Sequence, residues 1–207
     1  MPAITLRAFG PCQAGPMGDY EIRALTSETW PAYAALIEKH HGIFGGCWDT
    51  YFHSLERDPD RTYDSNRELK CRLVEEGRAH AAVVFDGDAA VGWCQYGSPD
   101  ELPNIHHRKQ YLAEADVLPD YRLTCIFVDR DHRRRGVTEV AIRGALDLIA
   151  DAGGGVVEGY PHEKPTKKVS SSFLYNATRP VYERMGFEYV RPKGLKNCVM
   201  RTTVAPR

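Results

Sequence analysis

The feature that most constrains the fold is an apolar run that leads directly into a basic turn and then into a helix. Residues 123–128 are Leu-Thr-Cys-Ile-Phe-Val, a nearly continuous apolar run that is typical of a central β-strand. Four arginines follow within residues 130–135. Residues 137–150 then carry apolar side chains at helical spacing, and glycines at 153–155 end the helix. A strand, a turn and a helix in this order predict an α/β fold.

The elements around this unit predict one mixed α/β domain. Residues 79–85 and 90–96 are apolar runs joined by Asp86-Gly87-Asp88, which predicts a β-hairpin. Residues 1–18 are rich in Gly and Pro, so we expect a flexible arm there and a single domain over 19–207. Further strands are expected over 20–25, 156–160, 187–190 and 198–204, and further helices from Glu28, from Asp64 or Ser65, and from Asn176 or Thr178 to Met185.

Composition and charge argue against several function classes. Lys and Arg total 27 against 28 Asp and Glu, so there is no basic field and we expect no nucleic-acid partner. No apolar run approaches the ~20 residues of a membrane span, so we expect no membrane association. Residues 1–18 lack a signal-peptide layout. The six cysteines are irregularly spaced, which predicts reduced thiols, no metal site and a cytoplasmic protein.

The basic turn has the composition of an anion site. The first N–H groups of a helix have no internal partners and lie at the positive end of the helix dipole. Gly136 has no Cβ, so an anion can approach the backbone closely. Arg133, Arg134 and Arg135 add positive charge, and a pyrophosphate is the natural ligand. From these residues alone, a surface turn with solvated arginines is an equal alternative.

The same segment resembles the acyl-CoA motif of the GNAT acyltransferases, whose core is Q/R-x-x-G-x-G/A. Val128, Arg133 and Gly136 match this motif at the expected spacing. Arg130 stands where proline is usual, and Thr138 stands where the last Gly or Ala is usual.

A second segment, Tyr182-Glu-Arg-Met-Gly-Phe187, resembles the Y-x-x-x-G-F signature near the end of the GNAT fold. A tyrosine hydroxyl near the CoA sulfur can protonate the thiolate that leaves when an amine attacks the thioester. The order of elements over 20–203 follows that of the GNAT family. Residues 92–97, 158–161 and 176–178 also resemble a group of mostly uncharacterised bacterial GNAT proteins.

The resemblance implies a mixed, mostly antiparallel sheet flanked by helices, in which the central strands 123–128 and 156–160 splay apart. Acetyl-CoA would enter this gap as co-substrate, without a metal. The N–H groups of Ile126 and Val128 would hold the pantetheine and polarise the thioester carbonyl. The backbone from Arg134 through Arg135, Gly136, Val137 and Thr138 to Glu139, with the Arg133 side chain, would hold the pyrophosphate.

The general base is less defined by the sequence. Glu158 lies on the splayed strand where some GNAT enzymes carry a glutamate, and the alternative is a strand-edge carboxylate that faces water. Asp49, Glu114, Asp116 and His162 are weaker candidates. The adjacent histidines at 40–41 and 106–107 are interpreted as surface residues, and Cys125 as core.

The acceptor site would be shaped by residues 42–52 and 99–120. The first segment carries Phe44, Trp48, Tyr51 and Phe52, which either line a pocket for an apolar amine or form core. We therefore expect an acetyl-CoA-dependent N-acetyltransferase that acts on a small-molecule amine by direct attack. A non-catalytic acyl-CoA-binding module and a protein N-acetyltransferase are the alternatives. The acyl chain length and the choice between monomer and homodimer stay open.

Overall fold

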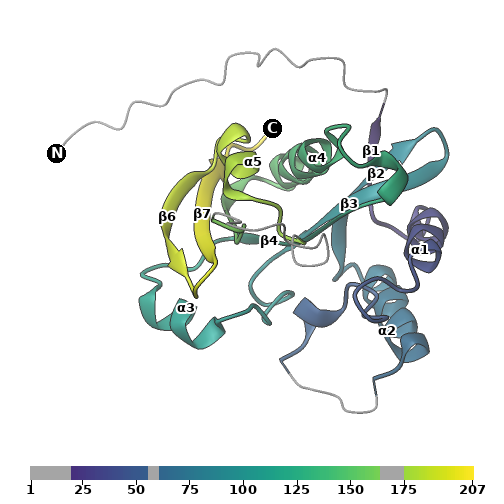
Figure 1. The fold of residues 1–207 in the computed structure, drawn as a ribbon, viewed down its shortest axis with the longest axis horizontal. Helices are drawn as coiled ribbons and strands as arrows, with labels where there is room; N and C mark the ends of the chain where they lie inside the picture. Colours follow the sequence, from purple (N-terminus) through teal and green to yellow (C-terminus); the bar gives the residue numbers. More distant parts are fainter. Residues whose placement is uncertain (1–19, 56–60, 164–174) are drawn as a thin grey trace.

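A seven-stranded β-sheet with the order β1-β2-β3-β4-β5-β7-β6 forms the centre of the protein (Figure 1). The computed structural model describes residues 20–55, 61–163 and 175–207, so the predicted arm over 1–18 and most of the predicted loop over 161–172 lie outside the described residues. The strands are β1 (Glu21–Ala24), β2 (His80–Asp86), β3 (Ala89–Gly97), β4 (Tyr121–Val128), β5 (Gly155–Gly159), β6 (Glu188–Lys193) and β7 (Asn197–Val204). All neighbours in the sheet are antiparallel except β4 and β5, which confirms the mixed, mostly antiparallel prediction.

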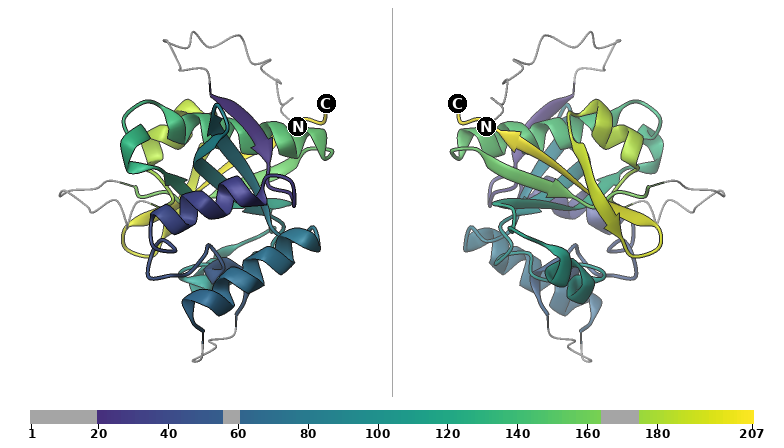
Figure 2. Two further views of the ribbon diagram at one scale, coloured as in Figure 1. Left: turned by 90° about the vertical axis from the view of Figure 1, so that its right-hand side faces the viewer. Right: turned by 90° about the vertical axis from the view of Figure 1, so that its left-hand side faces the viewer.

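Helices cover both faces of the sheet (Figure 2). One face packs against α4 (Val137–Asp151) and α5 (Arg179–Arg184), and the other against α1 (Trp30–Lys39) and α2 (Tyr63–Glu75). A short helix, α3 (Arg108–Glu114), lies below β6 and β7 in the view of Figure 1. The 3₁₀ turns η1 (Tyr51–His53) and η2 (Arg130–His132) complete the described elements.

The alternation of side chains along the strands separates the core into two layers. On β2, Ala82 and Val84 face α4, whereas Ala81 and Val83 face α1 and α2. A third, smaller cluster below β4, β5 and β7 contains Cys125 and Tyr111. Because both faces of β2 and β3 are buried, each strand is a continuous apolar run, and this is why the hairpin could be predicted from the sequence.

The central strands part, as predicted. Parallel pairing of β4 with β5 is limited to Tyr121–Leu123 against Val157–Gly159. The pairing of β4 with β3 skips Thr124, which forms a β-bulge. This bulge directly follows Leu123, the last residue of β4 that pairs with β5. Residues 124–128 therefore present a backbone edge that β5 does not cover.

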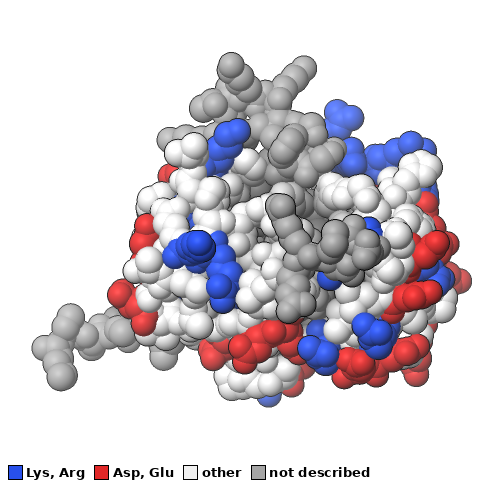
Figure 3. Space-filling model, turned by 90° about the horizontal axis from the view of Figure 1, so that it is seen from below, with Lys and Arg blue, Asp and Glu red and all other residues white. Residues whose placement is uncertain are grey.

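The surface shows no single-sign field on the side seen from below in Figure 3, where basic and acidic side chains are interspersed. In the described ranges, no helix is long and apolar enough to cross a membrane.

Candidate active site

The turn after β4 has the backbone that the sequence predicts for an anion site. Gly136 is the N-cap of α4 and adopts a left-handed conformation with φ +79°. A Cβ at this position would meet no atom within 4 Å, so the space beside the glycine is open. Arg134, two residues earlier, is also left-handed with φ 63°. The first N–H groups of a helix lack intrahelical partners, and here the Glu139 N–H already donates to the Gly136 carbonyl oxygen at 2.9 Å.

A pocket of about 270 Å³ adjoins this turn. It brings together most of the residues predicted to hold the pyrophosphate, namely Arg133, Arg134, Gly136, Val137, Thr138 and Glu139. It is also lined by Val128, which is predicted to hold the pantetheine. Arg135 is exposed and does not line the pocket. The Glu139 carboxylate pairs with Arg184 at 2.6 Å, so it does not oppose a bound anion with an unpaired charge.

A larger pocket of about 400 Å³ lies along the uncovered part of β4 and shares Val128, Arg133, Thr138 and Val181 with the turn pocket. We call it the strand pocket. Its full lining is His40, Ile43, Phe44, Ile126, Phe127, Val128, Arg133, Thr138, Ala177, Thr178 and Val181. The two pockets together form a channel from the start of α4 to the edge of β4.

The Ile126 amide departs from the prediction in one respect. Its N–H donates to the Tyr175 carbonyl oxygen at 2.6 Å, so the segment before α5 occupies this donor. Because alternate residues of a strand point to the same edge, the Val128 N–H faces the same side of β4. A pantetheine would therefore have to replace Tyr175 at Ile126.

Tyr182 lies on α5, and its side chain is fully buried. Its hydroxyl has no hydrogen-bond partner among the described residues. The ring lies so close to Gly159, where β5 leaves β4, that a methyl group at Gly159 would overlap it. Burial raises the pKa of the phenol well above its usual range, so the hydroxyl keeps its proton. Tyr182 lines neither pocket, so its role as acid toward a thiolate stays a prediction, which its place beside the gap allows.

Glu158 is buried, so the interpretation as a water-facing carboxylate is wrong. Its Oε1 accepts from Arg201 at 2.6 and 3.0 Å. Its Oε2 accepts from the hydroxyls of Tyr111 at 2.6 Å and Tyr160 at 3.3 Å. Glu158 does not line either pocket. Its role as base therefore stays a prediction, and the carboxylate already has four hydrogen bonds.

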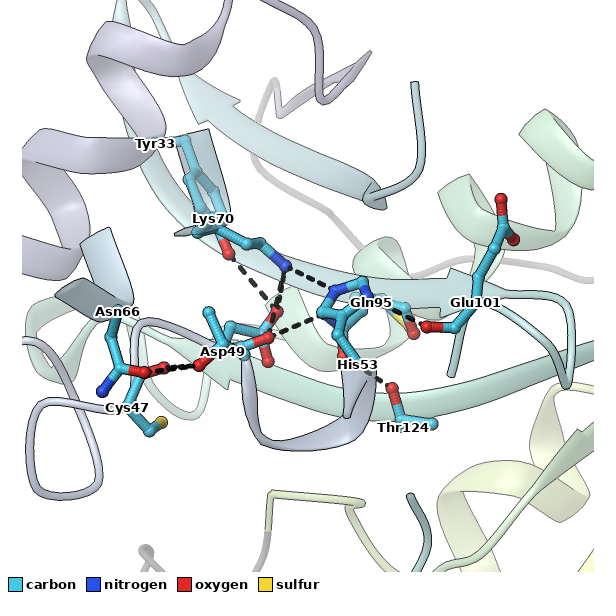
Figure 4. A network of polar contacts seen from close by, with 11 residues as sticks. Tyr33, Cys47, Asp49, His53, Asn66, Lys70, Gln95, Glu101 and Thr124 are labelled. Atoms are coloured by element: carbon cyan, nitrogen blue, oxygen red, sulfur yellow. Dashed lines mark hydrogen bonds and ion pairs between the residues drawn. The ribbon is translucent and has the colours of Figure 1, made fainter. Parts of the chain in front are cut away.

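The loop after α1 is held by a buried polar network (Figure 4). Asp49, with φ 58°, and Lys70 are both fully buried, and Lys70 Nζ lies 3.2 Å from Asp49 Oδ2. Tyr33 donates to the same carboxylate at 3.3 Å, and Gln95 Nε2 donates to the Asp49 carbonyl at 3.0 Å. Desolvation raises the pKa of the Asp49 carboxyl. Asp49 is buried and lines neither pocket, so it is not an accessible base.

His53 belongs to the same network and is held neutral. Its Nδ1 bonds the Glu101 carbonyl at 3.0 Å, and its Nε2 lies 3.0 Å from Gln95 Nε2 and 3.4 Å from Lys70 Nζ. Since carbonyl oxygen only accepts and Lys70 only donates, Nδ1 carries the proton and Nε2 accepts. Burial, with Lys70 beside the ring, lowers the pKa of His53 to about 2.

This network predicts acid sensitivity. The unfolded chain protonates His53 near its ordinary pKa, while the folded chain does so only near pH 2. The unfolded state therefore binds more protons below about pH 6.5, and stability falls as pH falls, by about 1–2 kcal/mol at pH 5. Urea unfolding at pH 7.5 and pH 5 should show a smaller drop for His53→Gln than for the unmutated chain. An equal drop in both would contradict the assignment, and His41→Gln, an exposed histidine, is the control.

The remaining predicted residues do not gather at the pockets. Glu114 pairs with Arg191 at 3.0 Å, Asp116 is exposed, and His162 forms an isolated backbone bridge with Thr178. The aromatic loop is divided, since Trp48 and Phe52 are core while Phe44 and Tyr51 are partly exposed and only Phe44 lines the strand pocket. Cys125 is buried as predicted, and the five described cysteines are free. Among the described residues, no group of three His, Cys, Asp or Glu side chains could hold a metal.

His40 is a pocket residue that the sequence interpretation missed. The sequence predicts a surface histidine here, because two adjacent histidines do not project from one helix face. In the structure α1 ends at Lys39, so His40 is the C-cap and turns toward the strand pocket, while His41 is exposed. The signal available in the sequence was the loss of helical periodicity before Gly42.

No protein-family model matches the sequence, and no curated protein matches it significantly. Solved structures match its fold at low identity. A GNAT-family acetyltransferase from Streptococcus agalactiae is 13% identical with a TM-score of 0.52, covering 91% of this chain and 97% of its own. An N-acetyltransferase from Staphylococcus aureus gives 12% and 0.51, covering 90% and 99%. The ribosomal-protein-S5-alanine acetyltransferase from Vibrio fischeri gives 13% and 0.51, covering 92% and 96%.

Proposed function

Since the chain has the fold of the GNAT acetyltransferases, we propose that it transfers an acetyl group from acetyl-CoA to the amine of a small molecule. One observation carries the proposal. The strand pocket runs from the uncovered edge of β4 to the open N-terminus of α4, which is the path that a pantetheine and its pyrophosphate require.

The residues of the channel supply distinct chemistry. Gly136 and the first N–H groups of α4 receive the pyrophosphate, and Arg133 adds positive charge. The amides of Ile126 and Val128 hold the pantetheine and stabilise the developing oxyanion, once Tyr175 leaves Ile126. The amine nitrogen attacks the thioester carbon, the C–S bond breaks, and Tyr182 gives a proton to the departing thiolate and recovers one from the nitrogen that becomes the amide. A base takes the other proton, which the ammonium form loses before attack.

A small acceptor is favoured over a protein. The strand pocket measures about 400 Å³ and must hold the pantetheine as well, so the room left for the acceptor suits a small molecule. Ile43, Phe44 and Phe127 line it with apolar surface, which suits an amine with an apolar or aromatic part. The Vibrio fischeri neighbour is named as an acetyltransferase of a ribosomal protein. Peptides with free N-termini are therefore tested beside small-molecule amines.

Binding of acetyl-CoA tests the proposal directly. Acetyl-CoA at about 100 times its dissociation constant stabilises the folded chain by ~2.7 kcal/mol and raises the Tm. Gly136→Glu should abolish the rise, because the carboxylate would occupy the anion position. Gly77→Glu is the matched control, since Gly77 also has a positive φ (66°) with no atom within 4 Å of a Cβ. No Tm rise in the unmutated chain at millimolar acetyl-CoA would refute the proposal.

Turnover tests the acceptor. Release of free thiol from acetyl-CoA is measured with a panel of primary amines, amino acids and peptides with free N-termini. We expect thiol release with at least one small amine and little with peptides. A reversed order would point to a protein acceptor, and binding without any turnover would point to a non-catalytic acyl-CoA-binding module.

A further inference from the structure

The strand pocket contains two ionisable side chains among its described lining residues, His40 and Arg133. A guanidinium does not release its proton in proteins, so it cannot act as a base. The imidazole is the group that can accept a proton near neutral pH. Glu158, by contrast, lies outside the lining and is bonded by Arg201, Tyr111 and Tyr160.

The His40 ring lies against Asp129 and Phe127. Its Nε2 lies 3.3 Å from Oδ1 of Asp129, which directly follows β4. The ring also packs edge-on against Phe127 with centroids 4.9 Å apart. Nε2 has no hydrogen-bond partner among the described residues, but the negative charge of the carboxylate favours the proton on this nitrogen, so Nδ1 is the nitrogen left to accept a proton.

Asp129 is itself held in place. Its side chain is 4% exposed, and its Oδ2 pairs with Lys39 Nζ at 2.6 Å. Its backbone N–H donates to the Val91 carbonyl at 2.8 Å, which continues the β3–β4 pairing past the end of the strand. The Asp129 carboxylate therefore has a fixed position beside the imidazole.

We propose that His40 is the general base of the acetyl transfer, with Asp129 as the positioning residue that orients its ring. The inference rests on the proposed function. Nδ1 of His40 takes one proton from the acceptor ammonium and passes it to water. The free amine then attacks the thioester carbon, and the second proton leaves with the CoA thiol after the C–S bond breaks.

The charges around the ring set the direction of the pH dependence. Burial lowers the pKa of His40, as do Lys39 on α1 and Arg130 on η2, while Asp129 raises it. Arg133 is the other charged group that lines the pocket. His40 is therefore mostly neutral at pH 7, as a base must be. Removing the Asp129 charge lowers the pKa of His40 further, so the acidic limb of the rate profile moves to lower pH.

The experiment compares His40→Gln with His41→Gln, its exposed neighbour, in thiol release from acetyl-CoA with the fastest primary amine of the panel between pH 5 and pH 9. His40→Gln should lower kcat by ~10²-fold or more and remove the acidic limb, while the Tm rise with acetyl-CoA stays. His41→Gln should behave as the unmutated chain. Asp129→Asn, which removes the charge beside the ring, should lower kcat by less than His40→Gln does and should move the acidic limb to lower pH. His40→Asn replaces His40→Gln if the latter does not fold.

Several results would overturn the inference. An intact acidic limb in His40→Gln would do so, as would an acidic limb removed by Glu158→Gln instead. A rise in the KM for acetyl-CoA with unchanged kcat would make His40 a binding residue. If the unmutated chain binds acetyl-CoA and acetylates the amine while His40→Gln is fully active, the inference fails and the proposed function stands. If the unmutated chain does neither, both fail.

Discussion

Replacing Lys70 by Met should lower the free energy of unfolding by about 3–5 kcal/mol, which is a large share of the stability of a domain. The reason is the fully buried pair that Lys70 forms with Asp49. Without the ammonium, the Asp49 carboxylate is left in the core with Tyr33 as its hydroxyl donor, and Oδ1 has no hydrogen-bond partner among the described residues. Leaving one charge buried and unpaired destabilises the folded state far more than the intact ion pair stabilises it.

A double-mutant cycle measures this effect. Lys70→Met, Asp49→Asn and the double variant are compared by urea unfolding at pH 7.5. Asn tolerates the left-handed backbone of Asp49, so the double variant should recover part of the loss because no charge remains buried. Arg72→Met on the same helix is the control, since its pair with Glu76 at 3.9 Å is exposed and should contribute ~0–1 kcal/mol. A Lys70→Met loss as small as that of Arg72→Met would contradict the argument.

The loss should also reach the site. The network anchors the loop that carries Ile43 and Phe44, and both of these residues line the strand pocket. We therefore expect a folded Lys70→Met sample at low temperature to show a raised KM for the amine.

Tyr182→Phe should lower kcat by ~10²-fold or more while the protein stays as stable as before. The hydroxyl has no hydrogen-bond partner among the described residues, so its removal breaks no bond in the core. Its place against Gly159 puts it beside the gap between β4 and β5. The loss should appear in kcat more than in KM, because the proton moves to sulfur in the transition state.

The leaving group provides a second readout. The loss in Tyr182→Phe should shrink with a thioester whose thiol is more acidic, since a good leaving group needs less protonation. Tyr96→Phe is the control, because Tyr96 is buried in the same core cluster but lies on β3. A Tyr182→Phe variant with nearly full activity on acetyl-CoA would make Tyr182 a packing residue.

Much of the fold could be predicted because its signals are local. The hairpin of β2 and β3 follows from two apolar runs around Gly87, which has φ 59° in the structure. Gly136 could likewise be placed at the start of α4, since a basic turn followed by glycine and an apolar helix is a contiguous pattern. The parting of β4 and β5 came from the family resemblance and not from periodicity.

The rest depends on partners that are distant in the sequence. Lys70 lies on a helix where an exposed position would be expected, and its burial follows from Asp49, 21 residues away. Glu158 was placed on the correct strand, but its burial depends on Tyr111 and Arg201, 47 and 43 residues away. No local pattern reports such pairs.

The bond between Ile126 and Tyr175 makes cofactor binding an exchange and not a simple addition. The apparent dissociation constant then equals the intrinsic one divided by the fraction of molecules whose Tyr175 has left β4. A fraction of about 1% would weaken binding about 100-fold, which corresponds to ~2.7 kcal/mol. Substitutions in the segment before α5 can thus set the affinity for acetyl-CoA without contacting it, by shifting this equilibrium alone.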